Sequence, residues 1–225
     1  MASQQLLFGI EYTHSAIRVT TSRGHRSLIT GRFEEAAEWL SHIFYGVGAA
    51  PKDPVRGVIS MPINLLREKG SEIAKAAKQN RFERVLTCST CYSLAHSEAL
   101  KNEVVVIHVT PDVSSVAIIG FERPSTQQGD FVRPIPGREA REIAVSLRCL
   151  LKPASADRRR RLIENVILGG DTETIARLGA DKLEKELWTL GVIPRFIENV
   201  HAAAEGSLNI ARRSQAQGWE KTSLI

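Results

Sequence analysis

The feature of this sequence that most constrains its fold is an order of strands and helices that occurs twice. In the first half, short apolar segments bounded by turn residues predict strands, and segments with apolar residues at intervals of three and four predict helices. The predicted order is βββαβαβα. The segments are residues 4–12, 16–22, 26–31, 33–48, 55–62, 63–81, 84–88 and 89–100.

The second half of the chain begins this order again. A repeated set of this kind predicts two similar α/β lobes, each with its own core. We place the first lobe at residues 1–102 and the second at 103–200, and we expect residues 201–225 to pack back on the lobes. The predicted segments are strands 104–109, 112–122 and 130–135, helix 137–151, strand 164–170, helix 171–190, and a closing helix 194–217 with Gly206 as a candidate break.

The composition is that of an ordinary globular chain, with 43% hydrophobic and 24% charged residues among 225. No apolar run reaches the roughly 18 residues that a membrane-spanning helix needs. The N-terminal segment lacks the basic and apolar regions of a secretory signal. The three cysteines, a low and odd number, fit a reducing compartment. We therefore expect a cytoplasmic protein without a membrane partner.

Two local clusters have simple structural interpretations. The net charge of +5 is spread along the chain except in DRRRRL at residues 157–162. Four arginines suit phosphate binding, but no aromatic residue interleaves them, so we favour a solvated helix start and expect no nucleic-acid partner. Cys88 and Cys91 form a CxxC pair without the second ligand pair of a zinc site, so we expect core packing and no metal.

Four segments, in the same order along the chain, resemble the nucleotide-binding domain of the Hsp70 family, within the actin, sugar kinase and Hsp70 superfamily. Residues 104–119, VVVIHVTPDVSSVAII, are similar to the family's VLIFDLGGGTFDVSIL, and residues 163–178, IENVILGGDTETIARL, are similar to IDEVVLVGGSTRIPKV. Residues 55–100 and 196–211 follow the patterns around RIINEPTAAALAYG and PDEAVAYGAAIQAA. The resemblance implies two RNase H-like lobes with a central cleft.

In that family the cleft binds ATP through two glycine-rich turns, and acidic residues at strand ends organise magnesium. Here the first turn reads GIEYTHS at residues 9–15, in which Glu11 replaces the family's aspartate and the turn glycine is absent. The second reads HVTPDV, in which His108 replaces the acid, every glycine is absent and Pro111 lacks a backbone donor. Cys88 stands where the family has the glutamate of NEPTA. These departures predict a chain that does not hydrolyse ATP.

One short segment keeps the family's glycines. Gly169 and Gly170 precede Asp171 and Thr172 at a predicted strand-to-helix junction. Two interpretations stay open at this point. The glycines hold a ligand near a helix N-terminus, or they form a tight turn whose helix is capped by Asp171 or Thr172.

The resemblance places the two altered turns opposite each other, and two hypotheses follow. The first is a cofactor-free enzyme that isomerises or cyclises a small organic substrate, including by a pericyclic reaction such as a Diels–Alder-type cyclisation. The second is a non-catalytic pseudo-ATPase, a scaffold or regulatory binding protein; a dimer is open under either. The candidate catalytic residues are His108, Asp112, Glu11 and His14. The candidate substrate-binding residues are Tyr12, Thr13, Ser15, Cys88, Thr110, Gly169 and Gly170.

Most of these candidate residues also have a structural interpretation. His108 suits a satisfied histidine at a strand end, Glu11 and Asp112 suit turn caps, and Cys88 suits core packing. A nucleophilic pair of Cys88 and His108 is a further arrangement to consider. An open cleft with convergent polar groups favours the enzyme, and a filled cleft favours the scaffold.

Overall fold

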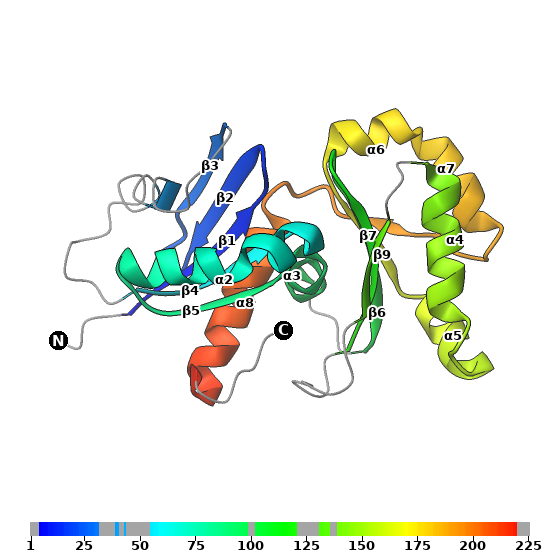
Figure 1. Cartoon of the computed structure of the whole chain (residues 1–225). Coiled ribbons are helices and arrows are strands. Elements are labelled where there is room, and N and C mark those ends of the chain that lie inside the picture. The colour runs from blue at the N-terminus through cyan, green and yellow to red at the C-terminus, as the bar shows by residue number, and fades with distance from the viewer. Residues whose placement is uncertain are drawn as a thin grey trace. The chain divides into compact units, whose positions relative to one another are not determined.

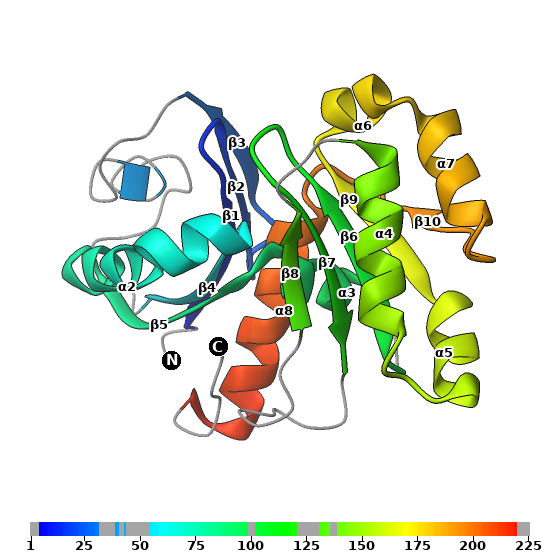
Figure 2. The same cartoon turned by 45° about the vertical axis from the view of Figure 1, so that its right-hand side comes forward.

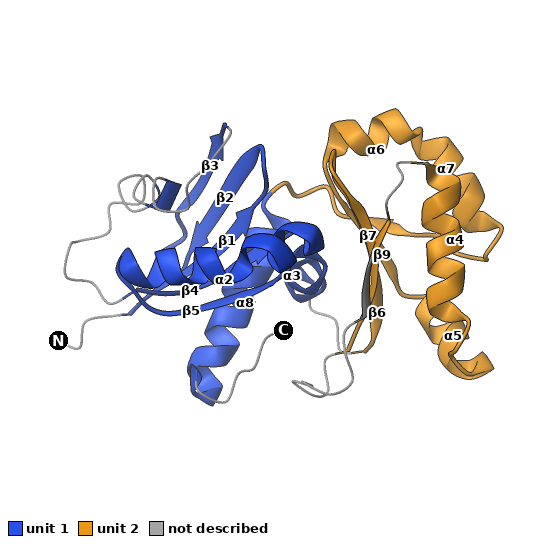
Figure 3. Ribbon diagram, in the orientation of Figure 1, with its two compact units in different colours: residues 1–98, 201–225 blue, residues 99–200 orange. Residues whose placement is uncertain are grey.

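The computed structural model describes residues 5–31, 39–40, 43, 55–98, 102–120, 131–135 and 139–219. The chain divides into two compact units: unit 1 comprises residues 1–98 and 201–225, and unit 2 comprises residues 99–200 (Figure 3). Each unit contains a five-stranded mixed sheet and helices that cover it (Figure 1). Most of the predicted helix 33–48 lies outside the described residues.

Unit 1 is built on a sheet with the strand order β3-β2-β1-β4-β5. β1, β2 and β3 are antiparallel neighbours, and β4 and β5 run parallel to β1. The strands and helices predicted for residues 55–100, and the three predicted N-terminal strands, are confirmed with small changes of bounds. The elements are β1 Leu6–Tyr12, β2 Ala16–Thr21, β3 Arg26–Thr30, β4 Val55–Met61, α2 Ile63–Gln79, β5 Phe82–Ser89, α3 Thr90–Ser97 and α8 Ala202–Gln217.

Alternation along β1 gives the two faces of this sheet different partners. Phe8 and Ile10 belong to a buried core that includes Leu65 and other residues of α2. Gly9 lies on the opposite face, where a Cβ atom would overlap the carbonyl oxygen of Ala204 in α8. Because successive strand residues point to opposite faces, the sheet is covered by α2 on one side and by α8 on the other.

The C-terminal helix α8 also packs closely against α3. A Cβ atom at Gly206 would overlap the carbonyl oxygen of Ser93, so glycine permits the close approach of the two helices. Asn209 Nδ2 donates to the carbonyl oxygen of His96 at 3.0 Å. α8 is therefore part of the interior of unit 1, although most of that unit comes from the first 98 residues.

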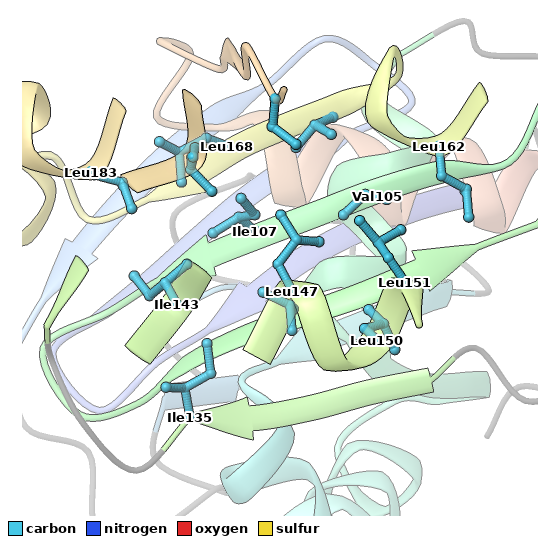
Figure 4. Close-up of a cluster of buried hydrophobic side chains, with 14 of the residues drawn as sticks. Val105, Ile107, Ile135, Ile143, Leu147, Leu150, Leu151, Leu162, Leu168 and Leu183 are labelled. Carbon is cyan, nitrogen blue, oxygen red and sulfur yellow. The ribbon is translucent and has the colours of Figure 1, made fainter. Parts of the chain in front are cut away.

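Unit 2 is built on a sheet with the strand order β10-β9-β6-β7-β8. β7 and β8 extend it in antiparallel fashion from β6, and β9 and β10 extend it in parallel fashion. Its helices α4, α5 and α7 lie beside this sheet (Figure 2). They contribute leucines to one buried cluster with β6 and β9 (Figure 4). The elements are β6 Val104–Val109, β7 Ser114–Ile119, β8 Phe131–Ile135, α4 Ala140–Leu151, α5 Ala156–Ile163, β9 Val166–Gly170, α6 Thr172–Leu178, α7 Ala180–Trp188 and β10 Arg195–Phe196.

Two predicted helices differ from the structure. The single helix predicted at 171–190 is two helices, α6 and α7, because Gly179 adopts a left-handed φ of 76° and ends the first. The closing helix predicted at 194–217 begins only at Ala202, and residues before it form the short strand β10, which pairs with β9. Gly206 does not break this helix.

The arginine run lies on α5, and most of its guanidinium groups bind other parts of unit 2. Arg158 donates to both carboxylate oxygens of Glu103, at 3.0 and 2.6 Å. Arg159 donates to three carbonyl oxygens at the end of α4 and in the following turn. Arg160 pairs with Glu164 one turn later. These contacts give the run a structural role.

Within the described residues, no helix combines the length and the apolar composition that a bilayer crossing needs.

Candidate functional site

The turn between β1 and β2 is closed by the side chain of Thr13. The Thr13 hydroxyl donates to the carbonyl oxygen of Ala16 at 2.9 Å and accepts from the Ala16 N–H at 3.0 Å. The Thr13 N–H also donates to the Ala16 carbonyl oxygen, at 2.9 Å. His14 and Ser15 are exposed at the tip of this turn. The Ala16 backbone donor is therefore used inside the protein.

The turn between β6 and β7 in unit 2 is closed in the same way. The Thr110 hydroxyl donates to the carbonyl oxygen of Val113 at 2.7 Å and accepts from the Val113 N–H at 3.1 Å. Thr110 is buried, whereas Pro111 and Asp112 are exposed. Since Pro111 has no N–H, this turn offers an external anion even fewer backbone donors than the first.

The two threonines occupy equivalent positions in the two units. Thr13 follows Glu11 by two residues, and Thr110 follows His108 by two residues. Glu11 pairs with β2 and β4 in the registers in which His108 pairs with β7 and β9. The duplication predicted from the sequence order is therefore visible at single positions, and both copies of the turn are closed by a threonine hydroxyl.

Glu11 lies at the end of β1, beside Arg18 of β2. Its carboxylate accepts from Arg18 Nη1 at 3.0 Å, and the two residues are cross-strand partners. Burial raises the pKa of Glu11, and the positive charge and hydrogen bond of Arg18 partly oppose that rise. The carboxylate thus has a cationic partner supplied by the protein.

A chain of buried hydroxyl and thiol groups continues along the same row of unit 1. Ser60 is the register partner of both Glu11 and Cys88 on neighbouring strands. Cys88 Sγ lies 3.2 Å from Ser93 Oγ, which lies 2.9 Å from Ser207 Oγ. Ser60 and Ser207 both donate to the carbonyl oxygen of Ile10, at 3.1 and 3.4 Å. The chain links β1, β4, β5, α3 and α8.

Sequence reasoning named Cys88 but missed its three serine partners. Ser60 lies near the end of a predicted strand, as Glu11 does, and that shared position was the available signal. Ser93 and Ser207 lie 114 residues apart and meet only because α8 packs on α3, which no local pattern indicates. Cys88 and Cys91 are both buried, which agrees with the predicted core packing.

His108 and Asp112 occupy different environments in unit 2. His108 is buried in β6, with Ser115 and Gly169 as its partners on the adjacent strands. Asp112 is exposed in the turn after β6. A role in acid–base chemistry for these two residues stays a prediction.

Gly169 and Gly170 end β9, and the following helix is capped by a side chain. Gly170 has φ 135°, and a Cβ atom there would overlap the carbonyl oxygen of Val109. Asp171 Oδ1 accepts from Thr174 N–H at 2.8 Å and from its hydroxyl at 2.6 Å. Asp171 is therefore the cap of α6, in agreement with one of the two interpretations above, and a ligand-binding role for Gly169 and Gly170 stays a prediction.

Tyr12 faces the core of unit 1. Its ring stacks on Trp39 with centroids 5.1 Å apart, and burial together with the charge of Glu72 raises the pKa of its hydroxyl. Tyr12 is 2% exposed, so its position indicates a packing role more directly than contact with a substrate.

The residues at the two strand ends do not fit the magnesium ion that the resembled Hsp70 family uses. Magnesium prefers oxygen ligands, and it is usually held by carboxylates and phosphates. Here Glu11 is paired with Arg18, and the equivalent position in unit 2 is His108. Among the described residues, no group of three histidine, cysteine, aspartate or glutamate side chains has metal-binding geometry.

Comparison with known proteins finds similarity in structure alone. No family model matches the sequence, and no curated protein matches it. A non-polymerising mutant of MamK bound to AMPPNP has a TM-score of 0.70 at 13% identity, over 94% of this chain and 100% of that chain. MreB 5 of Spiroplasma citri bound to AMPPNP has a TM-score of 0.63 at 10% identity, over 96% of this chain and 98% of that chain. EutJ from Carboxydothermus hydrogenoformans has a TM-score of 0.63 at 11% identity, over 92% of this chain and 90% of that chain.

These neighbours have the actin-like ATPase fold, and this chain shares it. The predicted α/β class with two similar lobes is confirmed. The predicted resemblance is confirmed at the level of the fold, whereas a specific closeness to Hsp70 is not shown by these neighbours.

Proposed function

We propose that this chain is a nucleotide-independent protein of the actin-like fold that acts as a scaffold or regulatory binding module. The observation that carries the proposal is the closure of both β-turns by threonine hydroxyls, Thr13 in unit 1 and Thr110 in unit 2. Phosphate-binding turns depend on backbone N–H groups that point outward at the anion. In these turns, the N–H groups of Ala16 and Val113 already donate to the hydroxyl oxygens of Thr13 and Thr110.

The charge at the strand ends supports the same proposal. A nucleoside triphosphate needs a divalent cation beside it, held by carboxylates. Glu11 is neutralised by Arg18, so a cation at this position has to displace an arginine. His108, at the equivalent place in unit 2, supplies no carboxylate. Two separate parts of an ATP site are therefore replaced by contacts that the protein makes with itself.

We also propose a more specific family relationship and a cellular location for this chain. We infer a closer relationship to Hsp70 than to other branches of the superfamily from the four ordered sequence blocks. We infer a cytoplasmic location because Cys88, Cys91 and Cys149 are free thiols, which persist in a reducing compartment.

A second candidate function rests on Glu11. A buried carboxyl group with a raised pKa is a property of general bases that work near neutral pH. The raised pKa of Glu11 therefore supports an alternative function, that of a cofactor-free isomerase or cyclase that acts on a small organic substrate. Loss of turnover of an identified substrate in a Glu11→Gln variant that retains its fold, and in His108→Ala and Asp112→Ala variants, distinguishes this alternative from the scaffold.

Isothermal titration with ATP and AMPPNP, each with magnesium, tests the primary proposal. We expect no heat of binding at millimolar nucleotide and no change in melting temperature. At about 100 times its Kd a ligand stabilises the folded state by about 2.7 kcal/mol, which a thermal shift detects readily. A saturable nucleotide-dependent rise in the melting temperature contradicts the proposal. An ATP-binding actin-like protein measured in the same buffer serves as the positive control.

A further inference from the structure

We propose that β3 pairs with the β3 strand of a second copy of this chain, so that the unit 1 sheets of two molecules join through an antiparallel pair centred on Leu28. The proposal goes beyond the scaffold function and does not depend on it. It concerns unit 1 alone, because β3 lies at one edge of that unit's sheet (Figure 1).

Hydrogen bonds at the two ends of the β2–β3 ladder fix which backbone groups of β3 face β2. The Thr21 N–H donates to the carbonyl oxygen of His25 at 2.9 Å, and the Gly31 N–H donates to that of Ser15 at 3.1 Å. Both pairs continue the β2–β3 register. Because hydrogen-bonded and non-hydrogen-bonded pairs alternate along an antiparallel ladder, the odd-numbered residues of β3 bond to β2.

The outer edge of β3 therefore presents the backbone groups of Arg26, Leu28 and Thr30. Their N–H and C=O groups point away from β2, and no strand lies beyond β3 within the described part of the chain. The side chains of these three residues share one face of the strand and are all exposed. Such a row of outward donors and acceptors is a template for a further strand.

The other three edges of the two described sheets carry features that discourage such pairing. β5 has the exposed Glu83 and Arg84, and its register shifts beside them. β8 contains Pro134, which lacks an N–H, and β10 has only two residues. β3 has no proline and a regular register, and its one charged residue, Arg26, pairs with Glu205 of the same chain. Charge, proline, bulges and short length are the usual protections of a free edge, so β3 is the unprotected one.

A second copy suits this edge because the strand complements itself. With a two-fold axis at Leu28, Leu28 faces Leu28 of the other copy and Arg26 faces Thr30. Every outward N–H of one strand then meets an outward C=O of the other, and no like charges face each other. The Leu28 side chain is 50% exposed in the single chain and is covered by its counterpart in the pair.

Sedimentation velocity on the intact chain, over a concentration series that ends near its solubility limit, tests the pairing. We expect the mean mass to rise from one chain toward two. Leu28→Lys and Leu28→Glu each place like charges at the two-fold axis, and we expect each to weaken the dimer by about tenfold. Val145→Lys on α4 is the matched control, because Val145 is 49% exposed, and it leaves association unchanged. The melting temperature of each variant establishes that it is folded.

An equimolar mixture of the two Leu28 variants tests the register itself. Lysine of one copy then faces glutamate of the other, so we expect the mixture to recover most of the wild-type association. A wild-type chain that stays monomeric throughout the series overturns the proposal and leaves the edge to a strand of another protein. A dimer that both single variants retain overturns it too, because its interface lies elsewhere. A mixture without recovery contradicts the pairing of Leu28 with Leu28.

Discussion

At the scale of single residues, the hydroxyl of Thr110 provides two hydrogen bonds that close the β6–β7 turn. Thr110→Val keeps the shape of the side chain and removes both bonds, leaving a buried N–H and carbonyl without that partner. We expect a loss of about 1–3 kcal/mol in the free energy of unfolding, measured by urea denaturation. Thr110→Ser retains the hydroxyl and serves as the control, with a loss below that of valine. An unchanged stability for Thr110→Val contradicts the closure.

His96 makes the stability of unit 1 dependent on pH. Burial, assisted by the charge of Arg213, lowers the pKa of His96 to about 3 in the folded state. The unfolded chain therefore binds a proton near pH 6.5 that the folded chain resists until about pH 3. We expect the stability to be full above pH 6.5 and to fall by about 1.4 kcal/mol for each pH unit below it, from this residue alone.

Urea denaturation of wild-type protein and His96→Gln at several pH values measures that contribution. The difference in stability between the two proteins should shrink as the pH falls from 7 to 5, because the glutamine does not titrate. A difference that stays constant over this range means that His96 binds a proton as readily in the folded chain as in the unfolded chain, which contradicts the lowered pKa.

Arg18 is expected to matter mainly through the carboxylate that it neutralises. Arg18→Met leaves Glu11 buried without its cationic partner, and breaking a buried pair in this way costs about 3 kcal/mol. Loss of Arg18 raises the pKa of Glu11 further above its unfolded value, so the cost is largest at neutral pH and decreases as acid protonates Glu11. Adding Glu11→Gln to Arg18→Met should recover much of the loss in urea denaturation. An additive loss in the double variant contradicts this account.

At the scale of elements, the contact between α8 and α3 depends on a glycine. Alanine normally stabilises a helix interior by about 1 kcal/mol relative to glycine, but at Gly206 its Cβ meets the Ser93 backbone. We expect Gly206→Ala to destabilise unit 1 and lower the melting temperature. Gly70→Ala in α2 is the matched control, because its Cβ meets only the flexible side chain of Leu66. Equal effects of the two substitutions contradict the packing described for α8.

Which elements were predictable from the sequence depends on how local their causes are. α2 was predicted because its apolar spacing lies within its own residues, and β6 because a run of β-branched residues is a local signal. β10 was not predicted, since two residues carry no period and its strand geometry comes from pairing with β9. The break at Gly179 was missed because a helical pattern continues on both sides of that glycine.

The candidate site was also predictable only in part, because its residues could be identified from the sequence but their partners could not. Glu11, Thr13, His108 and Thr110 were singled out because they replace glycines and acids of a resembled turn. Their partners were not predicted. Whether a threonine hydroxyl points outward or closes its own turn depends on the backbone conformation of that turn, and the pairing of Glu11 with Arg18 depends on the strand register.

At the scale of the whole molecule, two units keep one framework while the chemistry at equivalent positions has diverged. Glu11 and His108 occupy the same register position, yet one is an ion-paired acid and the other a buried histidine. Thr13 and Thr110, by contrast, make the same pair of bonds in both units. The feature shared by both copies is the closure of the turn.

The most direct test of this account is an NMR titration of the isotope-labelled chain with AMPPNP and magnesium, observing the backbone amides of Ala16 and Val113. Each amide already donates to a threonine hydroxyl, so we predict that neither resonance moves as the nucleotide reaches millimolar concentration. Saturable shifts of both resonances at a common Kd contradict the account, because they place phosphate at the two turns that the threonines close.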